Sequence, residues 1–90
     1  MIIETKKILE TIISELYRDH MSTGKKQMLE VINNLAVFAT WLPERQQEIY
    51  VTEVLQPILE AMEGSDSILL ADRIKYELIP FIDRYLEEKK

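Results

Sequence analysis

The residues best suited to chemistry are one histidine and a short polar run that follows it, His20 and then Thr23-Gly24-Lys25-Lys26. A single imidazole cannot form a two-histidine metal site within one chain, and there is no cysteine to supply sulfur to a zinc site. Phosphotransfer bundles place a lysine and a glycine shortly after the histidine on the same helix, whereas Gly24 and Lys25 follow His20 across a helix break. We therefore expect His20 to stand at a helix end, where the C-terminal dipole favours an imidazolium.

The run that starts at Thr23 is similar to the end of a phosphate-binding loop but departs from it in two places. That motif needs a glycine where this chain has Asp19, and a serine or threonine where it has Lys26. It also follows a strand, and the residues before it have helical spacing. The run therefore indicates a solvated turn.

Sixteen carboxylates could supply an acid and base pair, but they are spread along outward positions and interleaved with lysine and arginine. Glu77 has an evident partner in Arg73, one helical turn earlier, and a surface pair at this spacing contributes only about 0.3 to 0.5 kcal/mol. No serine or threonine has a base that the sequence can assign to it. We predict no catalytic residue, no cofactor and no metal site.

Charge and composition narrow the class of partner. The formal net charge of -5 opposes binding to a phosphate backbone, which normally needs clustered lysine and arginine. No apolar stretch approaches the roughly 20 residues that span a bilayer, and no basic segment precedes an apolar run at the start. We expect a cytoplasmic, bacterial-type protein that binds neither nucleic acid nor membrane.

The elements that would position these residues are helices. Two glycines and three prolines leave few residues for the turns of an all-β fold. Apolar residues recur at helical spacing in four segments, about residues 2–19, 23–42, 44–63 and 67–88. Because the connections are short, neighbouring helices should run antiparallel. We predict one all-α domain, an antiparallel up-down four-helix bundle with proline kinks in helices three and four.

The breaks between these segments carry capping residues. Ser22 is a candidate N-cap for the second helix, and Pro43 suits the first turn of the third. Gly64 is expected to supply a left-handed residue that ends the third helix, and Ser65-Asp66-Ser67 offers an N-cap for the fourth.

Two prolines, Pro57 and Pro80, fall inside the third and fourth helices, where each removes a backbone hydrogen bond. Apolar periodicity continues in phase on both sides of each, which favours bends within continuous helices over loops. Val51 is expected to point inward from the third helix. Five side chains are expected at the centre of the core: Leu35, Leu55, Ile58, Leu78 and Phe81.

The second helix has an unusual lack of charge, because Glu30 is the only charged residue between Gln27 and Leu42. Val37 and Trp41 lie one turn apart on the side that also carries Glu30 and Asn34, a side that should meet water in a lone bundle. Tryptophan is over-represented among residues that dominate binding energy. We predict an interface with a second copy or a partner helix, formed by Val37, Trp41, Asn34 and Glu30. In the alternative, Trp41 folds over the turn at Pro43 against the first or third helix.

The last helix resembles a segment of uncharacterised small helical proteins of Gram-positive bacteria. In these, an Ala-Asp-x-x-x-Tyr-Glu-Leu-x-Pro run lies in the last helix, and it is matched here by Ala71, Asp72, Tyr76, Glu77, Leu78 and Pro80. The resemblance covers about a sixth of the chain and implies a bacterial cytosolic helical domain.

Two functions from different classes remain. The first is a non-enzymatic protein–protein interaction module, either a homodimer or an adaptor for a partner helix, because small acidic bundles without cysteine look like secretion and flagellar export chaperones. The second is a small-molecule or regulatory sensor domain. Its ligand would occupy an apolar pocket that the two proline kinks open between helices three and four, lined by Leu55, Ile58, Leu78 and Phe81.

Overall fold

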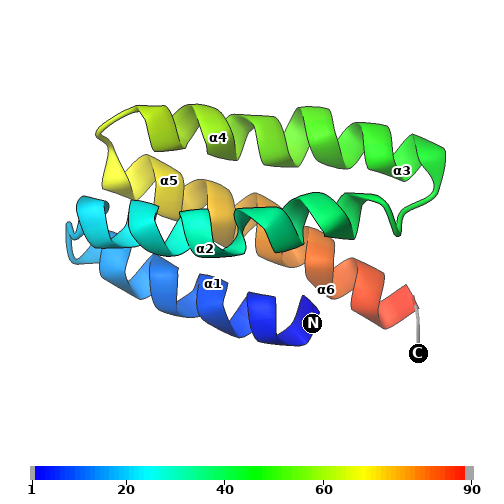
Figure 1. The fold of residues 1–90 in the computed structure, drawn as a ribbon, viewed down its shortest axis with the longest axis horizontal. Helices are drawn as coiled ribbons and strands as arrows, with labels where there is room; N and C mark the ends of the chain where they lie inside the picture. The colour runs from blue at the N-terminus through cyan, green and yellow to red at the C-terminus, as the bar shows by residue number, and fades with distance from the viewer. Residues whose placement is uncertain (1, 89–90) are drawn as a thin grey trace.

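Four long helices account for nearly all of the computed structural model, which describes residues 2–88 (Figure 1). The first helix is α1 (Ile2–Tyr17) and the second is α2 (Met21–Ala39). The third is made of α3 (Glu44–Ile49), the π-helical segment η1 (Tyr50–Leu55) and α4 (Gln56–Glu63). The fourth is made of α5 (Ser67–Arg73), the π-helical segment η2 (Ile74–Leu78) and α6 (Ile79–Glu88).

The helices pack around one shared core. α1 contacts α2 on one side and α5, η2 and α6 on the other, while the third helix contacts α2 through η1 and the fourth helix through α4 and η1. The described residues therefore form the all-α bundle of four helices that the sequence predicts. Within residues 2–88, no helix is long and apolar enough to cross a membrane.

The ends of the first two helices differ from the prediction. α1 stops at Tyr17 because Asp19 adopts a left-handed backbone, with φ at 64°. α2 already begins at Met21, so Ser22 lies inside its first turn, and the N-cap position falls to His20, whose side chain makes no capping hydrogen bond. The early start turns Gly24 toward α1, where a Cβ atom would lie 2.4 Å from Leu16 Cδ2. Gly24 is therefore a contact residue and not part of a turn.

The connection to the fourth helix corrects the role of Gly64. Its backbone is extended, with φ at -82° and ψ at -178°, so it supplies no left-handed residue. The predicted cap is present two residues later, where the Asp66 carboxylate accepts a hydrogen bond of 3.0 Å from the Leu69 amide.

Both internal prolines lie in helical backbone, with a π-helical segment directly before each. The Gln56 amide donates to the Val51 carbonyl ahead of Pro57, and the Ile79 amide donates to the Ile74 carbonyl ahead of Pro80. A proline crowds the carbonyl four residues earlier, and the wider π turn gives that carbonyl more room. No loop interrupts the helix at either proline, as the in-phase apolar spacing predicts.

The centre of the core holds three of the five expected side chains without any exposure, Leu35, Ile58 and Leu78, while Leu55 and Phe81 are half-buried against it. The prediction that Val51 points inward is wrong: Val51 is 41% exposed, and the fully buried side chain at that level of the helix is Tyr50. The π-helical turn explains the exchange: an α-helix rotates by about 40° over each step of four residues, and the wider turn reduces this rotation, so Tyr50, Val54 and Ile58 all stay on the inner side.

An aromatic cluster fills one end of the bundle, with Phe38 of α2 at its centre. Its ring makes edge contacts with Tyr85 at 4.9 Å, Tyr50 at 5.3 Å and Phe81 at 6.4 Å between centroids. The Tyr50 hydroxyl donates a buried hydrogen bond of 3.0 Å to the Leu35 carbonyl. Burial raises the pKa of Tyr50, because a phenolate would lose its solvation there.

Candidate interaction surface

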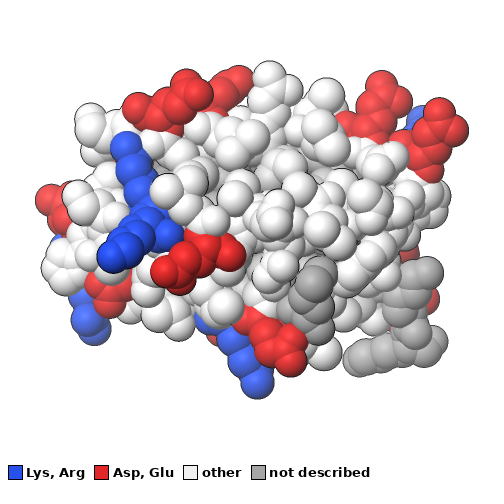
Figure 2. All heavy atoms as spheres, in the orientation of Figure 1, with Lys and Arg blue, Asp and Glu red and all other residues white. Residues whose placement is uncertain are grey.

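The outward side of α2 is the least charged part of the described surface. Its only ionisable side chains are Lys25, Lys26 and Glu30, all in its first half. Figure 2, in the same orientation as Figure 1, shows charged side chains along the edges and over part of the left half of this broad side, where red atoms reach close to the centre, and an uncharged area to the right of the centre. A large uncharged area is unusual on a small acidic protein, so the apolar side chains within it need an explanation.

Val37 and Trp41 are both on this surface, with exposures of 42% and 40%. The Trp41 ring makes an edge contact with Phe38, at 5.9 Å between centroids, and so leans on its own helix and the aromatic cluster. One side of the indole is thereby supported by the core while a large part remains in solvent. The expected exposure of Val37 and Trp41 is present, and their role in binding stays a prediction.

The two polar residues of the predicted interface lie on the same side of α2 as Val37 and Trp41. Asn34 donates a hydrogen bond of 3.5 Å to the Thr5 hydroxyl of α1, so it stands over the groove between the first two helices. Glu30 is exposed one turn earlier. Glu30, Asn34, Val37 and Trp41 therefore form a stripe along the α1 side of α2.

A second apolar stripe was not identified from the sequence. Leu29 of α2 is 65% exposed, as much as any large apolar side chain in the described chain. Val51 and Leu59 of the neighbouring third helix are 41% and 40% exposed, and α2 contacts that helix through η1. The sequence offers no clear signal for this stripe, because Leu29, Val51 and Leu59 have the same apolar character as the residues that fill the core. We call the five exposed apolar residues the α2 face: Leu29, Val37, Trp41, Val51 and Leu59.

The pocket between the third and fourth helices lies elsewhere than predicted. Ile58 and Leu78 have no exposure and line no opening, and Leu55 packs against the core. Of the four predicted residues only Phe81 lines a pocket, which has a volume of about 260 Å³ and lies between α3 and α6. The proline-containing level of the bundle is filled by side chains instead, because η1 and η2 bring Tyr50, Ile74 and Leu78 into it.

The titratable groups of the described chain mostly tie helices together. The Tyr17 hydroxyl donates to the Asp72 carboxylate at 2.6 Å, and this hydrogen bond, with partial desolvation, raises the pKa of Tyr17 to about 12. Lys6 of α1 pairs with Asp83 of α6, and His20 lies 2.7 Å from Glu15. The first two contacts link α1 to the fourth helix, whereas Glu15 and His20 are only five residues apart, and the three contacts do not gather around one cavity.

Residues 2–88 contain no group of three or more His, Cys, Asp or Glu side chains arranged to hold a metal ion. Comparison of the chain with protein-family models, with curated proteins and with solved structures finds no match. The resemblance of the last helix to small Gram-positive bacterial proteins therefore stays a prediction.

Proposed function

We propose that this chain is a non-enzymatic protein–protein interaction module that associates with a second copy of itself through the α2 face. The observation that carries the proposal is the exposure of Leu29, Val37 and Trp41, between 40% and 65%, on a helix with no charged side chain after Glu30. Covering such residues removes apolar area from water, which contributes roughly 25 cal/mol per Å² before the costs of association.

A second copy is favoured over a foreign partner by the pattern of charge. In a two-fold contact each residue near the axis meets its own copy, so a charged residue there would face a like charge. From Val31 to Leu42 the chain carries no charge, which leaves an uncharged region around Val37 and Trp41, as this symmetry requires.

The ends of the α2 face also fit a two-fold contact. Lys25 and Lys26 lie near the start of α2, and the exposed Glu44 and Glu48 lie just past its end. A two-fold axis through the middle of the face would bring the lysines of one copy toward the carboxylates of the other. Charge pairs at the rim add little affinity, but they orient the partners and oppose the wrong register.

The available area is adequate for a stable contact. The molecule measures 35 by 23 Å across its broad side. That side offers on the order of 800 Å², the area that each partner contributes to an interface of standard size. Trp41 would be an effective anchor, because its contact with Phe38 already limits the freedom that the ring would lose on binding.

The proposal extends to the fold and the setting of the protein. The three short connections support an antiparallel up-down order of the four helices, and the π-helical segments before Pro57 and Pro80 support a bend at each proline. We place this module in the cytoplasm, in keeping with its composition. A regulatory function through a small ligand is a second candidate, favoured only by the pocket between α3 and α6.

Sedimentation equilibrium of the parent chain tests the proposal, and Leu29→Glu is the decisive variant. Leu29 is 65% exposed, so the substitution should leave the fold intact while it places a carboxylate in an apolar part of the α2 face that the second copy would cover. The parent mass should rise with concentration toward that of a dimer, and the variant should remain a monomer. Ile68→Glu is the matched control, since Ile68 is 48% exposed but lies on α5 outside the α2 face.

A charge exchange tests the orientation. Lys26→Glu should weaken the dimer because it would face Glu48 of the second copy, and the double variant Lys26→Glu with Glu48→Lys should restore it. Circular dichroism of each variant separates loss of association from loss of helix. A parent chain that stays monomeric at every concentration would overturn self-association and leave a partner helix as the occupant of the α2 face.

A further inference from the structure

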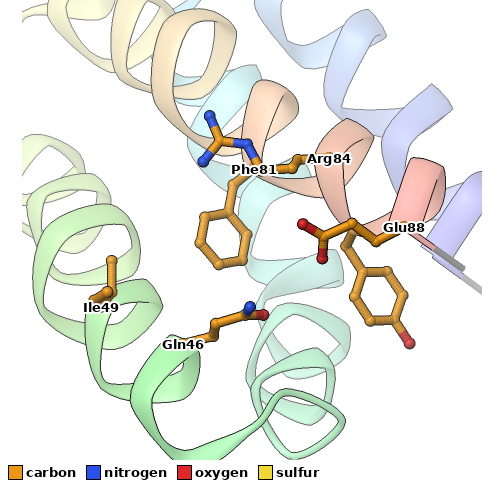
Figure 3. A pocket seen from close by; sticks show the side chains of 6 residues that line it. Gln46, Ile49, Phe81, Arg84 and Glu88 are labelled. Atoms are coloured by element: carbon orange, nitrogen blue, oxygen red, sulfur yellow. The ribbon is translucent and has the colours of Figure 1, made fainter.

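The pocket between α3 and α6 has an apolar floor and a charged rim. Six residues line it: we call the largely apolar Ile49, Phe81 and Tyr85 its floor, and the polar Gln46, Arg84 and Glu88 its rim. Figure 3 shows the Phe81 ring reaching from α6 into the space beside Ile49 and Gln46 of α3, with the side chains of Arg84 and Glu88 also extending from α6. An apolar floor with a few convergent polar groups is the usual form of a small-molecule site.

The floor is held in place by the core. The Phe81 ring packs on the buried Tyr50 ring at 5.1 Å, and Tyr85 packs on Phe38 at 4.9 Å. Tyr50 and Phe38 have no exposure, so the aromatic groups of the floor rest on rigid neighbours. A ligand would therefore meet a surface that is already formed, which lowers the cost of binding.

The two charged residues of the rim, Arg84 and Glu88, form no ion pair with each other, unlike an equally spaced pair earlier in the same helix. Arg73 and Glu77 are separated by four residues and form an ion pair, with contacts of 3.0 and 3.2 Å. Arg84 and Glu88 have the same spacing and order, yet within residues 2–88 no ion pair joins them to each other or to another side chain. The pocket thus presents one positive and one negative group that are not neutralised locally.

We propose that this pocket binds a free α-amino acid with an apolar side chain. The Arg84 guanidinium would hold the ligand carboxylate, and the Glu88 carboxylate would hold its ammonium group. The Gln46 amide lies across the pocket on α3 and can donate to the same carboxylate. The apolar side chain of the ligand would rest on Ile49, Phe81 and Tyr85.

Size and charge together favour this class of ligand. A volume of about 260 Å³ lies below the range of about 300 to 1,000 Å³ that is typical of pockets for drug-sized molecules. A simple anion would leave Glu88 facing a like charge, and a simple cation would leave Arg84 in the same position. A zwitterion with a short apolar side chain satisfies both groups and fills the floor.

The inference does not depend on self-association, because none of the pocket residues belongs to the α2 face. The monomeric background Leu29→Glu should bind the amino acid as the parent does. Failure of one proposal therefore leaves the other intact, and the two outcomes can be told apart in the same set of variants.

The test is a titration of the ¹⁵N-labelled full chain followed by NMR, with L-leucine as the probe. Two analogues report the ends of the ligand: N-acetyl-L-leucine lacks the ammonium charge, and L-leucinamide lacks the carboxylate. L-leucine should shift the resonances of Ile49 and Phe81, and each analogue should bind about tenfold more weakly or worse, because it loses one charge-assisted hydrogen bond.

Variants assign each end of the ligand to one residue. Arg84→Gln should weaken L-leucine about tenfold but leave L-leucinamide unchanged, and Glu88→Gln should weaken L-leucine but leave N-acetyl-L-leucine unchanged. Arg73→Gln and Glu77→Gln are matched controls outside the pocket and should bind as the parent does. The proposal is overturned if L-leucine shifts no pocket resonance at millimolar concentration, or if both analogues bind as tightly as L-leucine.

Discussion

The contact between Gly24 and Leu16 predicts that Gly24→Ala destabilises the protein, although alanine is ordinarily the better helix former. A Cβ atom at position 24 would lie 2.4 Å from Leu16 Cδ2 and 2.8 Å from Leu16 Cγ, well inside van der Waals contact. Leu16 has no exposure, so its side chain cannot swing into solvent to relieve the clash. It must move within a packed core, and its neighbours must adjust.

The size of the effect follows from two opposing contributions. Overpacking a core by one methyl group costs about 1 to 3 kcal/mol, and replacing glycine with alanine inside a helix stabilises by up to about 1 kcal/mol. With the full gain from alanine subtracted, the free energy of unfolding should therefore fall by up to about 2 kcal/mol. Each kcal/mol lowers the Tm of a domain of this size by about 4 to 8 °C, which thermal unfolding by circular dichroism resolves easily.

Gly64→Ala is the matched control, because the same change there meets only the Ala61 carbonyl, at 3.6 Å, and the backbone is extended. It should be neutral or stabilise by about 0.4 to 1 kcal/mol, through the entropy of the unfolded chain. In a Leu16→Ala background, Gly24→Ala should cease to destabilise, since the clashing atoms are gone. If Gly24→Ala melts at or above the parent, the close approach of α1 and α2 at this point is wrong.

Four further predictions concern the core residues Tyr50 and Leu78 and one of the prolines, Pro80. Tyr50→Phe should lower the free energy of unfolding by about 0.5 to 1.5 kcal/mol in urea, because it removes the hydrogen bond to the Leu35 carbonyl. Burial raises the pKa of Tyr50 above its ordinary 10.0, so the unfolded chain loses the phenol proton at a lower pH than the folded chain does. The free energy of unfolding should therefore keep its full value below pH 10.0 and fall above it, and it should fall less steeply in Tyr50→Phe. Leu78→Ala should cost about 2 to 5 kcal/mol, whereas the 42% exposed Leu69→Ala should cost far less. Pro80→Ala should raise or barely change the Tm, since an ordinary amide can rejoin the helix.

Each of these has a result that would contradict it. An alkaline unfolding curve identical for the parent and Tyr50→Phe would mean that the phenol is solvated. A Leu78→Ala variant that melts within about two degrees of the parent would mean that the inner face of the fourth helix is misassigned. A strongly destabilised Pro80→Ala would show that the π-helical turn depends on the proline.

The helices could be predicted because their apolar spacing is regular over many residues. The span 44–63 agrees with the structure at both ends and the span 67–88 at its start, where Pro43 and the cap at Asp66 mark the beginnings of the two helices. The start of α2 could not be predicted in the same way. Ser22 and Gly24 have the local properties of a cap and a turn, and only the packing of Gly24 against Leu16 shows that the helix has already begun.

The candidate site was partly predictable for a similar reason. The exposure of Val37 and Trp41 follows from their place opposite the inner row of α2. The exposure of Val51 could not be predicted, because it depends on a π-helical turn, in which an amide bonds to the carbonyl five residues earlier. No residue type within η1 indicates such a turn. The pocket also required the structure, since its lining comes from α3 and α6, which are far apart in the sequence.

The two π-helical segments determine where the long helices could lose one residue and still keep the core. Each holds one more residue than an α-helical path through the same space would need, in effect an insertion absorbed without a loop. Deleting one residue elsewhere in either helix would rotate everything beyond it by about 100° and turn the inner row to solvent. Deleting one within Tyr50–Leu55 or Ile74–Leu78 would instead return the turn to α-helical geometry and leave the flanking halves in phase. These are the two places in the long helices where a homologue one residue shorter could keep the same core.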